Sequence, residues 1–344
     1  MTRSDHRPTH AAEQPLWRYL VRRTQRKFTA DRCTDLAAGL TFHAVISIFP
    51  ALLATLTLLS VISKEQTAVN AVLRVLKPLV SSESLAQIAA VLRDFGNAHV
   101  SGWALVGTIA LSLWTASGYV NAFGRAMNRI LEVPEGRPIW KARPAMFAVT
   151  LVLILLVVVL LVVLTVSGGM ASSIGQLLGL SELTQQLWSL AKWPAFLLVA
   201  TFLTAVLYWA TPNVRRSRIR WTSIGAAVAV LVWMIASWGL SFYIARFANY
   251  NRTYGSLAGA VIALLFLYVS NLALLIGAEV DAELERLRQL KQGIHAEERL
   301  QWDLRATSRI IRTERSRQRD LAYARALREE AAREAATEEA DPAQ

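Results

Sequence analysis

The sequence predicts an all-α integral membrane protein: a six-transmembrane-helix bundle with amphipathic helices on the extracytoplasmic side and a charged cytoplasmic C-terminal helix and tail. Only 18% of the 344 residues are charged, against about 25% in an average soluble protein. Hydrophobic residues make up 54% of the chain, and the mean hydropathy is +0.34. Six windows without Asp, Glu, Lys or Arg reach the roughly 20 residues that a helix needs to cross the hydrocarbon core.

These six windows must be helical in a bilayer, because backbone polar groups find no water partner there. The window around Val149 to Val166 is almost entirely Leu and Val. The others mix aliphatic residues with Ser, Thr, Gly and Asn, as is typical of helices that pack on one another. The predicted spans, which form a membrane domain over residues 36–280, are 37–62, 102–122, 145–168, 193–212, 222–245 and 255–278.

The distribution of basic residues predicts the orientation of these spans. Short loops that are rich in Lys and Arg remain on the cytoplasmic side of the membrane. Both termini are therefore expected in the cytoplasm, which agrees with an even number of spans. Residues 1–35 contain no apolar core of a signal peptide, so we expect the first span to direct its own insertion. Thirty of the 37 Lys and Arg residues lie in 1–35, 125–143, 215–220 and 279–344.

Four segments outside the spans show helical patterns. Residues 15–30 predict a basic amphipathic helix at the cytoplasmic interface, within the N-terminal segment 1–35. Residues 64–94 and 172–190 predict helices on the outer face, either as a cap or as a substrate vestibule. Residues 281–344 predict a charged helix that becomes disordered by about Ala335. The cytoplasmic basic excess indicates contact with membrane lipids through anionic headgroups, and no nucleic-acid partner is expected, because acidic residues offset the basic ones in the tail.

Catalytic patterns are missing from the sequence. It contains no P-loop, no GxGxxG after a strand, no HExxH and no GxSxG. The single cysteine, Cys33, excludes an intramolecular disulfide, and the five histidines lack metal-ligand spacing. We therefore predict no catalytic, cofactor-binding or metal-binding residue, and we expect that the protein is not an enzyme.

Polar residues and prolines at membrane depth remain as candidates for function, because polarity is costly there. His43 is the only imidazole within a predicted span, and the nearby Pro50 frees a carbonyl and kinks the helix. Hydrogen bonding between helices explains such residues as well as a transport path does. The candidate transport-path or structural residues are Asp35, His43, Ser47, Pro50, Trp114, Asn121, Pro212, Asn213, Tyr254, Gly255, Asn271 and Glu279.

Several motifs in a fixed order resemble the YihY/BrkB family of bacterial inner-membrane proteins, over about residues 20 to 285. Within the motif from Asp35 to Pro50, Phe42-His43 stands where this family commonly has an aromatic pair, Tyr-Tyr, and this difference weakens a role for His43. The motifs are Asp35 to Pro50, Leu113-Trp114-Thr-Ala-Ser with Asn128 downstream, Tyr208 to Asn213, Tyr254-Gly255-Ser256, and Ile276-Gly277-Ala278-Glu279.

The resemblance implies a six-helix protein of the bacterial inner (plasma) membrane. Some members are described as transporters or linked to surface-lipid export, and a ribonuclease label has also been used; the residues do not support that label. Our leading hypothesis is a transporter or exporter of a lipid or another amphiphilic or small solute. The rival is a non-transporting scaffold for envelope partners, and a membrane enzyme is a weaker third possibility. The sequence leaves the substrate, the coupling ion and the oligomeric state open.

Overall fold

The computed structural model describes residues 15–62, 102–165, 182–215, 224–246 and 256–340, with six single positions between 70 and 90. Within these residues the fold is all-α, and an isolated antiparallel bridge joins Val214 to Leu304. The helices are α1 (Leu16–Ala30), α2 (Cys33–Ile62), α5 (Gly102–Ile130), α6 (Ile139–Thr165), α8 (Glu182–Ala210), α9 (Ile224–Arg246), α11 (Ser256–Lys291) and α12 (Ser308–Ala340).

A helix lies over each of the six predicted spans, and four of these helices are long and apolar enough to cross a membrane. The first two predicted spans, 37–62 and 102–122, correspond to α2 and α5, which are not among the four; the apolar described part of α2 is Cys33–Ile48. The described residues thus support a multi-pass membrane protein. The four segments are Ile139–Leu161, Ala191–Ala210, Ile224–Tyr243 and Gly259–Lys291.

Three helices extend beyond the limits that the sequence predicts. The sixth predicted span ends at 278, but α11 continues to Lys291 and crosses the predicted domain boundary at 280. α8 begins at Glu182, so part of the predicted outer segment 172–190 is continuous with a span. α12 continues to Ala340, past the predicted onset of disorder at Ala335, because Ala, Glu and Arg are strong helix formers. Most of predicted segment 64–94 lies outside the described residues.

The ends of the helices follow from local chemistry. α1 ends where the Asp31 N–H donates to the Lys27 carbonyl oxygen at 2.8 Å, and Arg32 then takes a left-handed φ of 53° before α2 begins. α8 ends at Ala210 because Pro212 lacks an N–H and restricts the residue before it. The two-residue turn of Asp31 and Arg32, between α1 and α2, brings the basic helix α1 against the start of α2.

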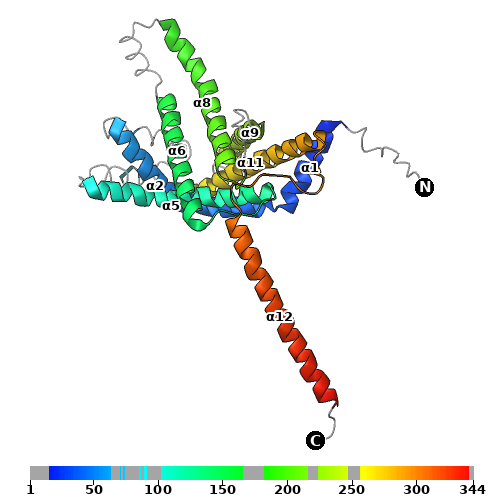
Figure 1. The fold of residues 1–344 in the computed structure, drawn as a ribbon. Helices are drawn as coiled ribbons and strands as arrows, with labels where there is room; N and C mark the ends of the chain where they lie inside the picture. The colour runs from blue at the N-terminus through cyan, green and yellow to red at the C-terminus, as the bar shows by residue number, and fades with distance from the viewer. Residues whose placement is uncertain are drawn as a thin grey trace.

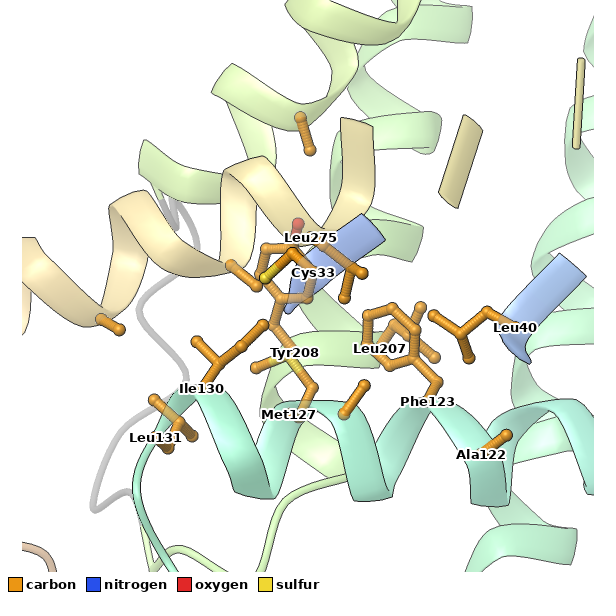
Figure 2. Close-up of a cluster of buried hydrophobic side chains, with 14 of the residues drawn as sticks. Cys33, Leu40, Ala122, Phe123, Met127, Ile130, Leu131, Leu207, Tyr208 and Leu275 are labelled. Atoms are coloured by element: carbon orange, nitrogen blue, oxygen red, sulfur yellow. The ribbon is translucent and has the colours of Figure 1, made fainter. Parts of the chain in front are cut away.

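Aromatic and aliphatic side chains from six helices (α2, α5, α6, α8, α9 and α11) contribute to the main core. The rings of Phe123 (α5) and Tyr208 (α8) stack with centroids 6.1 Å apart and an interplanar angle of 5°. Leu40 from α2, Met127 from α5 and Leu275 from α11 are buried around them, as Figure 2 shows. This core holds α2, α5, α8 and α11 together.

α12 stands apart from the other helices (Figure 1). Every residue from Ile311 to Arg333 is exposed. At its base, the Arg309 N–H donates to the Gly136 carbonyl oxygen at 3.0 Å, and the Arg312 guanidinium lies 5.9 Å from the centre of the Trp140 ring. These contacts fix where α12 leaves the body of the protein.

Candidate functional site

A hydrogen-bonded triad joins three helices at one of the predicted polar positions. The Tyr119 hydroxyl donates to Asn271 Oδ1 at 2.8 Å, and Asn271 Nδ2 donates to Thr41 Oγ1 at 3.2 Å. Asn271 and Thr41 are buried. The triad connects α5, α11 and α2, and it satisfies the polar groups that the amide of Asn271 brings into the bundle.

The predicted residues of α2 face α5. The buried Ser47 hydroxyl donates to the Thr115 carbonyl oxygen at 3.4 Å. His43 Nε2 lies 3.4 Å from Arg125 Nη2. Pro50 lies inside the helix, as the sequence predicts. Ser47 and His43 of α2 therefore both lie close to polar groups of α5.

The predicted candidates Trp114 and Asn121, both on α5, lie in different environments. Trp114 is 53% exposed, and the Arg143 guanidinium lies 5.5 Å from the centre of its ring. Asn121 Nδ2 is buried without a hydrogen-bond partner. Asp35, in the first turn of α2, is exposed. Tyr254 and Gly255 lie outside the described residues.

Asn213 is the most highly connected of the predicted residues that the structure describes. Its backbone N–H donates to Asn128 Oδ1 at 2.8 Å. Its side-chain nitrogen donates to the carbonyl oxygens of Pro134 (3.1 Å) and Ala306 (3.0 Å), and its Oδ1 accepts from the Ala306 N–H at 3.2 Å. The preceding Pro212 is buried with it. Asn213 thus ties the end of α8 to the segment before α12.

A closed ring of polar contacts surrounds Asn213. Asn128 Nδ2 donates to Glu135 Oε2 at 2.8 Å. Arg137 binds the same carboxylate with two nitrogens, each at 2.8 Å, and donates to the Thr211 carbonyl oxygen at 2.8 Å. Burial would raise the pKa of Glu135, but the hydrogen bonds from Arg137 and Asn128 hold it below its usual value.

Glu132 forms a second hub, which sequence reasoning missed. It follows α5 with a left-handed φ of 58°. Its carboxylate accepts hydrogen bonds from Lys27, from Arg286 Nη2 at 3.0 Å and from the Leu300 N–H at 3.2 Å. Its backbone carbonyl accepts from Arg299 Nη2 at 2.9 Å. Glu132 therefore joins α1, α11 and the segment after α11.

Arg286 is fully buried, with 1% of its surface exposed. Its guanidinium contacts Glu283 Oε1 at 3.2 Å, the Ala296 carbonyl oxygen at 2.6 Å and Glu132. Arg305 similarly donates to the last carbonyl oxygens of α8, at Trp209 (2.7 Å) and Ala210 (3.0 Å), which are the groups that a helix C-terminus leaves unpaired. Residues 294–307 are thereby clamped across the helix ends; we call this segment the strap.

Glu279 lies beside the first residue of α2. Cys33 Sγ donates to Glu279 Oε1 at 3.3 Å, and both residues are buried. The predicted candidate Glu279 thus lies against the thiol of α2, and the Asp31 carboxyl group acts on it electrostatically. Among the described residues, no three His, Cys, Asp or Glu side chains come together in a way that could hold a metal ion.

The amino-acid sequence of the chain matches a known family. A family model described as virulence factor BrkB matches residues 24–301. The chain belongs to the BrkB family. The match runs from α1 through the hubs and most of the strap, and it ends before α12. Asn213 and all the partners of Glu132 are therefore part of the BrkB region, whereas Ala306 and the exposed helix α12 lie beyond it.

Relatives of this BrkB chain carry two kinds of name. This chain is 27% identical to the ribonuclease-like protein YfkH of Bacillus subtilis, over 77% of this chain and 94% of the relative. It is 26% identical to a UPF0761 membrane protein of Xanthomonas campestris, over 76% of this chain and 60% of the relative. A UPF0761 membrane protein of Alkalilimnicola ehrlichii is 30% identical over 74% of this chain and 55% of its own length. This chain thus spans little more than half of these UPF0761 relatives, and no solved structure matches it.

Proposed function

We propose that this BrkB protein crosses the bacterial inner membrane six times, with both termini in the cytoplasm, and moves a lipid or another amphiphilic or small solute. The membrane family and the four apolar helices support a membrane location. The helices over all six charge-free windows support the number of spans. The concentration of Lys and Arg on one side supports the orientation.

The triad of Tyr119, Asn271 and Thr41 carries the transport part of the proposal. Its side chains come from three helices and hydrogen bond to one another. Polar groups on facing helices of a membrane bundle are costly and commonly mark substrate or ion pathways. A small rearrangement of α2 against α11 would open this triad to a solute.

A scaffold is the second candidate, and α12 is the observation that favours it. The helix is exposed from Ile311 to Arg333 and stands apart from the body (Figure 1). It lies beyond the BrkB match. An exposed helix of this length offers a surface for a protein partner without any need for transport.

We also propose that the protein acts without catalysing a reaction. The polar side chains of the Asn213 ring and the Glu132 hub bind one another, so they are engaged in holding the fold. The name of YfkH raises ribonuclease activity as the alternative. Incubation of the purified protein with labelled RNA tests it, and cleavage above that of a mock purification would overturn this part of the proposal.

Flux measurements in vesicles separate transport from scaffolding. The protein is reconstituted into vesicles that contain a fluorescent phosphatidylglycerol, and a membrane-impermeant quencher is added outside. Transport is followed as the quenching of lipid that moves from the inner to the outer leaflet. We expect Asn271→Leu to lose most of the flux, while Ser241→Ala, whose hydroxyl bonds only within its own helix, retains it. Wild-type flux no faster than in protein-free vesicles, or unchanged flux in Asn271→Leu of equal thermal stability, would contradict the transport proposal.

Reporter fusions test the orientation. A periplasm-active reporter fused after residue 344 should be inactive, and a cytoplasm-active reporter at the same place should be active. The reverse pattern would overturn the proposed placement of the termini.

A further inference from the structure

Four carboxyl groups lie within electrostatic range of one another where the α1–α2 turn meets α11. They belong to Asp31, Glu132, Glu279 and Glu283. Three of them have cations as partners. The closest nitrogen–oxygen distances are 2.8 Å for Arg23 with Glu283, 3.0 Å for Arg286 with Glu132, and 3.9 Å for Arg129 with Asp31.

Glu279 differs from the other three. It is 1% exposed, the Cys33 thiol donates to it at 3.3 Å, and the Asp31 carboxyl group lies close enough to act on it electrostatically. Among the described residues, it forms no ion pair; the nearby Lys27, which acts on it electrostatically, pairs with Glu132 instead. An ionised carboxylate that is buried without a cation is strongly disfavoured, so such a group instead takes up a proton.

The neighbour of Glu279 completes the arrangement. When two carboxyl groups touch, one proton between them removes the repulsion and makes an O–H donor for the remaining carboxylate. We propose that Glu279 and Asp31 share a single proton, and that this pair is a buried proton-binding site joining the α1–α2 turn to α11.

Charged groups from every neighbouring element surround the pair. Lys27 from α1 and Arg129 from α5 favour the ionised form of Asp31, and Glu132 after α5 favours the protonated form. Lys27 and Glu283 act on Glu279 in opposite senses, as Lys27 and Glu132 do on Asp31.

Burial is the largest influence on Asp31, and it raises the pKa of that carboxyl group. The pKa shift agrees with the geometry, in which the Glu279 carboxyl group and the Cys33 thiol are in contact and buried and Asp31 Oδ2 is buried without a hydrogen-bond partner. The Cys33 thiol can donate to only one oxygen, and so it does not replace the missing cation.

Loss of the shared proton has a structural consequence. Two carboxylates in contact repel each other, and the α1–α2 turn is the part that can separate from α11. The first residue of α2 is Cys33, so the contact between the first turn of α2 and α11 would weaken when the proton is lost. The site would respond to pH whether or not the protein transports a solute.

Infrared spectroscopy of the full-length protein in lipid tests the proposal directly. We expect the wild-type protein at neutral pH to show the C=O stretching band of a buried protonated carboxyl group, and this band to disappear in alkaline buffer. Glu279→Gln should lose the band. The matched control Glu285→Gln, on the same helix but paired with Arg288 at 3.1 Å and partly exposed, should keep it.

Thermal unfolding provides a second measurement. Glu279→Gln mimics the protonated pair, so its unfolding midpoint should not change between neutral and alkaline pH, whereas the midpoint of the wild type should fall. Asp31→Asn should show the same loss of pH dependence. A wild-type protein without the band, a band that persists in Glu279→Gln, or equal pH dependence in all variants would overturn the proton site.

Discussion

Asn213 donates its side-chain amide to the Ala306 carbonyl oxygen, 3.0 Å away and 93 positions later in the chain. The Ala306 N–H returns a hydrogen bond to Asn213 Oδ1 at 3.2 Å. The Arg305 N–H also donates to the Asn213 carbonyl oxygen at 3.2 Å. One asparagine thus holds the strap against the end of α8 through both its side chain and its backbone.

Asn213→Ala should release the strap. The substitution removes the side-chain partners of the Pro134 and Ala306 carbonyl oxygens and of the Ala306 N–H, which we expect to lower the free energy of unfolding by roughly 2–4 kcal/mol. Limited proteolysis in detergent should then cut within 294–307. Gln318→Ala, on the exposed part of α12, serves as the control, and equal cleavage of both variants would contradict the role of Asn213.

The sequence could predict the helices, because charge-free windows of this length have no other stable conformation in a bilayer. It could also single out Asn213, Asn271 and Glu279 as polar residues in costly places. Their partners could not be predicted. Asn271 bonds to Thr41, which is 230 positions away, and Cys33 bonds to Glu279, which is 246 positions away.

Charged residues were the hardest part to predict. Arg286 belongs to a charged stretch that resembles a solvated tail, yet it is buried against Glu132 and Glu283. Glu132 takes its position from a left-handed backbone conformation at the end of α5, which a residue other than glycine seldom adopts. Only tertiary contacts distinguish these two residues from the many exposed charges around them.

Acid should weaken the Glu132 hub. Burial would raise the pKa of Glu132, but Lys27, Arg286 and the Leu300 N–H outweigh burial and hold it below its usual 4.5. A lowered pKa contributes stability that is present above the unfolded value and is lost as the pH falls through the folded value. We therefore expect the thermal unfolding midpoint of the wild type to decrease when the pH is lowered below about 4.5.

Glu132→Gln is the matching variant. It should be less stable than the wild type at neutral pH, because Lys27 and Arg286 lose a charged partner, and its acid-induced loss should be smaller. Thermal unfolding over a pH series measures both effects. An acid limb as steep as that of the wild type would assign the loss to other carboxyl groups.

Arg312→Ala should weaken binding to anionic lipid. Arg312 lies over Trp140, which is 64% exposed at the start of α6, a pairing suited to the headgroup layer. A basic residue near an anionic surface contributes about 1 kcal/mol, or roughly fivefold in affinity. Native mass spectrometry with phosphatidylglycerol measures it. Arg319→Ala, farther along α12, is the control, and equal losses in both variants would show a general charge effect without a local site.

Gly277→Ala should separate α9 from α11. A Cβ at this position would lie 2.4 Å from the Gly225 carbonyl oxygen, 2.5 Å from Ala229 Cβ and 2.7 Å from the Tyr208 hydroxyl. The backbone oxygen cannot move alone, so the helices must shift, at a cost of roughly 1–3 kcal/mol in the free energy of unfolding. Gly239→Ala is the matched control, because nothing lies within 4 Å of its Cβ, and alanine there should be neutral or stabilising by up to about 1 kcal/mol. Thermal unfolding of the two variants in the same detergent compares them, and equal midpoints would show that the close approach of α9 and α11 is not needed for stability.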